Sequence, residues 1–230
     1  MRIKSLMILL MCAVLMFTAA CSGNNQKNDA DSGSASSDTA GNSENGSKTD
    51  GKSIVIYFSR VGNTDFPADV DALTSASIRI DNGTVKGNAQ LMAEYIAAEA
   101  GCETYEITVE EPYPVDYDET VNLAREEQNK NARPALKNDT INTDEYDTVY
   151  LVFPNWWADL PMPLYTFFEN HDFSSKTINV FATHEGSGFS KTVDAVKKLE
   201  PKADVNEGLA VRGANVTDEE QSIRKWVKDN

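Results

Sequence analysis

The sequence S-I-V-I-Y-F-S-R-V-G-N-T at Ser53–Thr64 decides the fold that we predict for this chain. Its apolar run, Ile54–Phe58, consists of β-branched and aromatic residues, as is typical of a strand covered on both faces in a parallel sheet. The run ends in small and hydroxyl residues. Open α/β sheets bind ligands in such loops at the carboxyl ends of their strands, where backbone N–H groups can bind a phosphate. An ordinary turn from strand to helix explains this stretch equally well.

Similar apolar runs alternate with helical patterns along the rest of the chain. We expect four further strands, at 103–109, 146–153, 177–182 and 203–211. We expect five helices, at 89–100, 119–131, 163–170, 189–199 and 217–228. Two short β-prone runs around Asn82-Gly83 predict a hairpin inserted after the first strand. The alternation predicts a parallel sheet with helices on both faces.

The amino terminus has the pattern of an export signal. Arg2 and Lys4 precede an apolar run that is too short to span a membrane, and small residues lead to Cys21. Residues 1–20 resemble a bacterial lipoprotein signal, which implies lipidation of Cys21. Cleavage without a lipid is the alternative, since Thr18 stands where such signals usually have leucine. Residues 21–52 then form a flexible linker, and residues 53–230 form the single folded domain.

The negative net charge of the chain lies in the predicted folded domain. The chain has a formal net charge of −15, and residues 1–52 contain equal numbers of acidic and basic side chains. An acidic domain disfavours binding to nucleic acid or to anionic lipid headgroups, so we expect attachment to the membrane through the lipid alone. The two histidines and Cys102 do not suggest a zinc site, and no catalytic triad is evident.

Two other loops follow predicted strands and carry unusual residues. Residues 154–163 contain the adjacent Trp156 and Trp157 among three prolines. Exposing both indoles would be unfavourable, so we expect one to pack against the domain and one to be available to a ligand. Residues 183–188, T-H-E-G-S-G, are polar and rich in glycine, which permits close approach of the backbone to a flat ligand. His184 is expected to make a local hydrogen bond, although a proton donor is the alternative.

Four motifs in this order resemble the flavodoxin family, in its flavodoxin-like lipoprotein branch. They are Y-F-S-R-V-G-N-T, then Y-P-V-D-Y-D-E-T with R-P-A-L, then F-P-N-W-W-A-D-L-P-M-P-L-Y-T-F-F-E, and finally T-H-E-G-S-G-F. The resemblance covers 53–230. It implies an α/β fold: a three-layer, doubly wound, five-stranded parallel sheet of flavodoxin-like order 2-1-3-4-5, here with a β-hairpin insert after the first strand.

The resemblance also implies FMN as the cofactor, with its phosphate in the first loop and its ring between the two later loops. The predicted cofactor-binding residues are Ser59, Arg60, Val61, Gly62, Asn63, Thr64, Gly87, Asn88, Ala89, Pro154, Asn155, Trp156, Trp157, Ala158, Thr183, His184, Glu185, Gly186, Ser187 and Gly188. Either Trp156 or Trp157 would stack on the flavin. Because the insert separates Thr64 from the helix, the phosphate loop is predicted to be split, with residues 59–61 as its first half and Gly87–Ala89 as its second.

The function that we expect is electron transfer by an FMN-binding, flavodoxin-like protein anchored outside the cytoplasm. Its redox partner would be another protein or a small quinone-like acceptor. One alternative is an FMN-dependent reductase that uses a nicotinamide donor and a quinone-type acceptor. A second is an interaction module without flavin, because Val61 and Ala89 lack the hydroxyl groups that the family often has there.

Overall fold

The computed structural model describes residues 51–67 and 77–230, which belong to one compact unit, Ser47–Asn230. The predicted signal, Cys21 and nearly all of the predicted linker lie outside the described residues. Within the described part, no helix is both long and apolar enough to cross a membrane. No cluster of three His, Cys, Asp or Glu side chains there could hold a metal ion.

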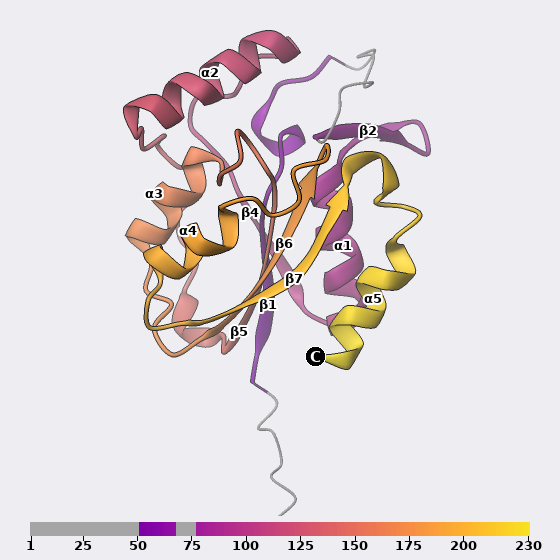
Figure 1. The fold of residues 1–230 in the computed structure, drawn as a ribbon, viewed down its shortest axis with the longest axis vertical. Helices are drawn as coiled ribbons and strands as arrows, with labels where there is room; N and C mark the ends of the chain where they lie inside the picture. Colours follow the sequence, from indigo (N-terminus) through magenta and orange to yellow (C-terminus); the bar gives the residue numbers. More distant parts are fainter. Residues whose placement is uncertain (1–50, 68–76) are drawn as a thin grey trace, which may run out of the picture. The chain divides into compact units, whose positions relative to one another are not determined.

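Five parallel strands form the central sheet (Figure 1). They are β1 (Ser53–Phe58), β4 (Glu103–Ile107), β5 (Thr148–Pro154), β6 (Thr177–His184) and β7 (Asp204–Arg212). Their order is β4-β1-β5-β6-β7, with β1 paired to β4 and β5 on its two sides. Counting only these strands, the order is 2-1-3-4-5, which confirms the predicted topology. The reversal of strand order beside β1 places the sheet's switch point there.

The predicted insert is confirmed as a separate two-stranded antiparallel sheet. It consists of β2 (Ile78–Asp81) and β3 (Thr84–Gly87). The two residues of the turn, Asn82 and Gly83, have φ angles of 48° and 79°. Tight hairpins favour positive φ at both central positions, and Asn-Gly adopts it at low cost, so the local sequence explains the turn.

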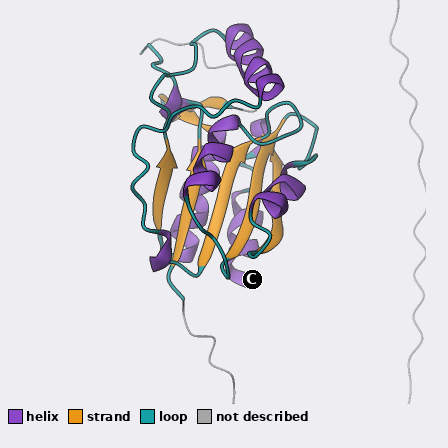
Figure 2. Cartoon of the chain, turned by 90° about the vertical axis from the view of Figure 1, so that its left-hand side faces the viewer, coloured by secondary structure: helices purple, strands orange, loops and turns teal. Residues whose placement is uncertain are grey.

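Helices cover both faces of the central sheet (Figures 1 and 2). On one face, α1 (Asn88–Ala100) and α5 (Glu220–Asp229) pack on a core that includes Val55, Val152 and Phe181. On the other face, α3 (Met162–Asn170) and α4 (Thr192–Leu199) pack on a larger core that includes Phe58 and Phe153. The remaining helix, α2 (Tyr117–Lys130), lies at the carboxyl end of the sheet.

Two predicted helix starts were wrong. The last helix begins at Glu220 and not at Thr217, because a turn precedes it in which Glu220 N–H bonds to Thr217 O at 3.4 Å; the Thr217 hydroxyl accepts instead from Arg79 Nη2, at 3.1 Å. The helix α4 begins at Thr192 and not at Phe189, because the preceding residues form a turn in which Thr192 N–H bonds to Phe189 O. In both places a turn of the same period precedes the helix, so the apolar pattern extends beyond the helix start.

A buried amide joins the loops that follow β1 and β4. The side-chain nitrogen of Asn63, which is 2% exposed, donates to Ser59 O at 2.8 Å and to Ile107 O at 3.0 Å. Its side-chain oxygen accepts from Val109 N–H at 2.8 Å, and its backbone oxygen accepts from Tyr113 N–H at 2.7 Å. Every hydrogen-bonding group of this amide side chain is therefore used in holding two loops together.

Replacing this amide is expected to destabilise the protein. Asn63→Ala leaves buried backbone groups of both loops without partners, so the free energy of unfolding should fall by about 3 kcal/mol. Urea denaturation followed by circular dichroism measures the change. Asn206→Ala is the control, because that amide makes only a 3.4 Å contact with Asp204. Similar losses for the two variants would show that the Asn63 bonds are not important.

At the opposite end of the sheet, a buried carboxyl predicts a pH dependence of stability. Glu200 is 7% exposed, and burial raises its pKa to about 7, with Asp172 adding to the shift and the backbone of Phe173 opposing it. Because the folded state keeps its proton to higher pH than the unfolded chain, stability should fall as the pH rises from about 4.5 to about 7.

Glu200→Gln removes this ionisation. The variant should match the wild type near pH 4.5 and exceed it by up to about 3 kcal/mol at pH 8. Unfolding free energies across this range measure the difference. The exposed Glu207→Gln is the control, and its pH profile should follow that of the wild type. A constant difference between E200Q and the wild type at all pH values would contradict the assignment.

Candidate functional site

The loop after β1 is buried and polar. Ser59 and Arg60 are each 1% exposed, and Val61–Asn63 form a short 3-10 helix. Val61 N–H donates to the Ser59 hydroxyl oxygen at 3.3 Å, which leaves that hydroxyl proton available as a donor. Thr64 is also buried, and its hydroxyl oxygen has no hydrogen-bond partner among the described residues.

The structure brings the two halves of the predicted split loop together. A Cβ atom on Gly87 would lie 1.9 Å from the Ser59 hydroxyl oxygen, so only glycine permits this approach. Helix α1 begins at the next residue, Asn88. Two of the N–H groups at this helix start are used within the chain: Gly87 N–H bonds to Gln90 Oε1 at 3.2 Å, and Asn88 N–H bonds to Ser77 O at 3.0 Å.

The first loop also has an acidic neighbour on the edge strand. A Cβ atom on Gly62 would lie 1.9 Å from Glu106 Oε1. Burial raises the pKa of Glu106, although a hydrogen bond with Tyr57 opposes the shift. The absence of a side chain at Gly62 therefore leaves room for this carboxyl beside the loop.

The two adjacent tryptophans lie in different environments, as expected. The Trp156 ring makes edge contacts with Phe58 and Tyr113, at centroid distances of 5.4 and 5.1 Å. Trp157 is 46% exposed, and its indole N–H donates to Val121 O in α2 at 3.0 Å. The Arg125 guanidinium lies 4.8 Å from the Trp157 ring centroid. Thus one indole packs on the core and the other bridges to α2.

Backbone geometry explains how the tryptophan loop turns. Trp157 and Ala158 have positive φ angles of 54° and 61°, and Trp156 and Asp159 exchange two backbone hydrogen bonds of 3.1 Å. This is a tight hairpin turn without glycine, so both central residues adopt a conformation that costs free energy for residues with a Cβ atom. Such strain is often retained at functional sites, and here it directs the Trp157 side chain toward α2.

The loop after β6 is fixed by local hydrogen bonds. Gly186 N–H donates to His184 Nδ1 at 2.7 Å, which confirms the predicted local bond of this histidine. The Asn155 side-chain nitrogen donates to Gly188 O at 2.8 Å and joins this loop to the tryptophan loop. Gly186 has φ +133°, and a Cβ atom there would lie 3.2 Å from Arg212 Nη2, so the glycine also provides room for that guanidinium.

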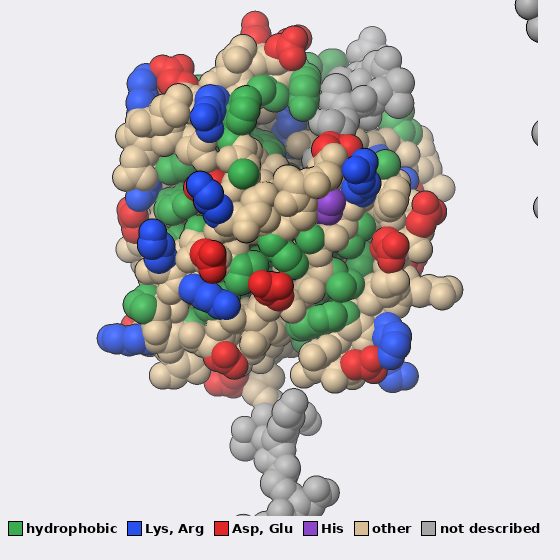
Figure 3. All heavy atoms as spheres, viewed as in Figure 1, with side chains coloured by type: hydrophobic (Ala, Val, Ile, Leu, Met, Phe, Trp, Pro, Cys, Tyr) green, Lys and Arg blue, Asp and Glu red, His purple; other side chains and the backbone are tan. Residues whose placement is uncertain are grey.

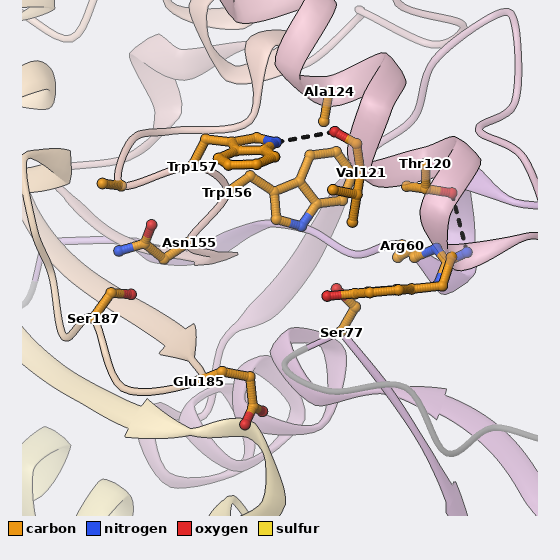
Figure 4. A pocket seen from close by; sticks show the side chains of 12 residues that line it. Arg60, Ser77, Thr120, Val121, Ala124, Asn155, Trp156, Trp157, Glu185 and Ser187 are labelled. Atoms are coloured by element: carbon orange, nitrogen blue, oxygen red, sulfur yellow. Dashed lines mark hydrogen bonds between the residues drawn. The ribbon is translucent and has the colours of Figure 1, made fainter.

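A cavity of about 370 Å³ lies between these loops and α2 (Figure 4), and the surface is hollowed below α2 in Figure 3. Seven predicted site residues line it: Arg60, Asn155, Trp156, Trp157, Ala158, Glu185 and Ser187. The other predicted residues are not among its lining residues: Ser59, Val61, Gly62, Asn63, Thr64, Gly87, Asn88, Ala89, Pro154, Thr183, His184, Gly186 and Gly188. Their part in cofactor binding stays a prediction.

One wall of the cavity was missed by the sequence reasoning. Tyr117, Thr120, Val121 and Ala124 line it from α2, and Ser77 lines it from the insert. The four residues of α2 have the spacing of one helical face, so this stripe on an otherwise polar helix was the available signal. Its apolar members suggest packing, but the stripe faces the cavity.

Arg60 is held against this wall. Its Nη2 donates to Val115 O at 2.9 Å and to Thr120 Oγ1 at 3.1 Å, with longer contacts to the carbonyl oxygens of Pro114 and Asp116. Burial lowers the pKa of the guanidinium, while Tyr117 and Asp116 oppose the shift. The side chain therefore crosses from the first loop to α2 and does not fold back over its own loop.

Comparison with known proteins agrees with this architecture. The sequence pattern of the flavodoxin family matches residues 77–230. A candidate flavoprotein of Bacteroides eggerthii is 27% identical, with 78% of this chain and 97% of that chain covered and a TM-score of 0.58. A candidate flavoprotein of Bacteroides uniformis is 26% identical, with 77% of this chain and 98% of that chain covered and a TM-score of 0.59.

A flavoprotein of Lactobacillus acidophilus, solved in complex with FMN, is 20% identical, with coverage of 73% of this chain and 97% of that chain and a TM-score of 0.50. At this identity the likeness shows the fold alone. No curated protein matched the sequence. The family pattern spans more than half of the chain, and the strand order is that of the doubly wound fold. The chain therefore belongs to the flavodoxin family.

Proposed function

We propose that this protein binds FMN in the cavity beside α2 and transfers electrons outside the cytoplasm, where a lipid on Cys21 holds it at the membrane. The observation that carries the cofactor proposal is the cavity itself, which opens at the switch point of the sheet, where open α/β folds bind ligands. Membership of the flavodoxin family and the FMN complex of the Lactobacillus acidophilus structure support the choice of FMN.

The residues present suit a flat, partly polar ring. Trp156 and Trp157 supply aromatic surface, and Figure 4 shows both indoles beside the α2 wall. The side-chain oxygen of Asn155 is buried without a hydrogen-bond partner among the described residues, so it can accept a bond from a ligand. Ala124 and Ser187 are small enough to leave room for the ring between the walls.

Bound FMN would supply the capacity to accept and donate electrons. The contribution of the chain is to bind and orient the ring and to exclude water from it. Aromatic side chains on the ring disfavour its charged form, which is one way a protein without acid or base catalysts sets a flavin potential. Ser59 and Thr64 place hydroxyl groups at the first loop, where the phosphate is proposed to bind.

Titration of the purified full chain with FMN tests the cofactor proposal. Quenched flavin fluorescence and a perturbed visible spectrum at one equivalent are expected. Trp157→Ala should weaken FMN binding about tenfold, because an aromatic contact contributes on the order of 1 kcal/mol. Because the variant also loses the bond to Val121 O and the contact with Arg125, its unfolding free energy is measured alongside and is expected to fall by about 1 kcal/mol.

Ile80→Ala is the matched control, because Ile80 is an exposed apolar side chain of the hairpin that does not line the cavity. An unchanged FMN affinity in both variants would exclude a contact between Trp157 and the flavin. A folded wild type that does not bind FMN would reject the proposal. Steady turnover of NAD(P)H with a quinone would instead favour the reductase over the electron carrier.

Membrane attachment has a separate test. Cells that express the full chain should carry it in the membrane fraction with incorporated labelled fatty acid, and Cys21→Ala should release it from that fraction and abolish the label. Cys102→Ala is the control, because Cys102 belongs to the folded domain and should leave both properties unchanged. Persistent labelling of C21A would show that another residue carries the lipid.

A further inference from the structure

The buried guanidinium of Arg60 has no negatively charged partner among the residues that the structure describes. The side chain is 1% exposed, yet no described carboxylate forms an ion pair with it. Asp116, whose backbone oxygen Arg60 contacts, uses its carboxylate to cap α2, where Oδ1 accepts from Glu119 N–H at 2.9 Å. A buried charge without a counter-charge costs several kcal/mol, so its retention needs a reason.

The hydrogen bonds of Arg60 satisfy only part of the side chain. Nη2 donates to neutral oxygens of residues 114–116 and Thr120, and the Phe66 ring centroid lies 5.2 Å from Cζ. The Nε atom is buried and has no hydrogen-bond partner among the described residues. An arginine that only anchored α2 would need neither a charge nor an unused donor, because neutral groups can hold carbonyl oxygens.

The position of Arg60 suits a ligand group as its partner. The residue lines the cavity, and in Figure 4 it lies on a different side from Glu185, the acidic residue of the same lining. The cavity is thus positively charged at the Arg60 side and negatively charged at the Glu185 side. A ligand with a negative group at one end is oriented by this arrangement.

We propose that Arg60 is the counter-charge for a negatively charged group of the bound flavin nucleotide. The inference rests on the proposed function. Two groups of FMN have this chemistry: the terminal phosphate, and the ring once two electrons and one proton have been added to it. Both would pair with the same buried guanidinium, and their affinities can be measured separately.

The experiment compares FMN with riboflavin, which lacks the phosphate. Dissociation constants are measured for both flavins, oxidised and reduced with dithionite, on the full chain and three variants. Arg60→Met removes the charge and the hydrogen bonds. Arg60→Lys keeps the charge. Thr120→Val keeps the charge and removes one contact between Arg60 and α2. It therefore shows how flavin affinity changes when α2 is held less firmly.

If the partner is the phosphate, R60M should reduce the preference for FMN over riboflavin at least about tenfold, since a charged hydrogen bond contributes on the order of 1.5–3 kcal/mol. If the partner is the reduced ring, R60M should weaken the binding of reduced riboflavin by a similar factor and the binding of oxidised riboflavin much less. In either case R60K should restore most of the difference in affinity between the flavins. T120V should weaken the binding of all four ligands by the same factor.

The inference is overturned if R60M weakens the binding of all four ligands by one common factor, as T120V does, or leaves all four affinities unchanged. Arg60 would then be an anchor of α2 alone. A wild type that is folded by circular dichroism and binds neither flavin would instead reject the proposed function. Thermal unfolding of each variant shows that the affinities refer to folded protein.

Discussion

The carboxyl end of the sheet depends on the side-chain amide of Asn63. Parallel strands end in loops whose backbone groups need partners when they are buried. Asn63 supplies these partners to the loops after β1 and β4 at once. By fixing the first loop the amide fixes the start of the Arg60 side chain. The backbone oxygen of Asn63 accepts from Tyr113 N–H and so fixes the residues just before α2. The position of the cavity wall follows from these bonds.

Arg60 extends this support from the loops to α2. The helix has only two buried residues, Thr120 and Ala124, so apolar packing alone holds it weakly. Arg60 binds the chain before the helix and the Thr120 hydroxyl, and the Trp157 indole binds Val121 O one residue later. The wall is therefore held mainly by polar contacts with the two loops that bound the cavity. A ligand group that binds the Arg60 guanidinium therefore affects the same contacts with α2.

Local patterns predicted the elements, while long-range contacts decided the site. The apolar runs of β1 and β5 and the Asn82-Gly83 turn were sufficient for the sheet and the insert, because strand periodicity and turn chemistry are local. The quoted motifs also placed the two later loops beside the cavity. For the α2 wall, the stripe on the helix indicated a contact face but not that this face lines the cavity. Its role depends on Arg60 reaching residues 114–120, and nothing in the sequence near Arg60 or Thr120 specifies that contact.

The insert shows why the first loop can be interrupted without loss of its geometry. Lengthening a loop costs only a slowly growing entropy, provided that its two ends are held. Here Gly87 packs on Ser59, and Asn88 N–H bonds to Ser77 O, so the helix start lies beside the strand end despite the residues between them. The same bonds, with Gln90, use two of the N–H groups with which a helix start can hold an anion. An anion at this end must therefore rely more on side chains, such as the buried hydroxyl groups of Ser59 and Thr64, while the positive charge of Arg60 lies further along, at α2.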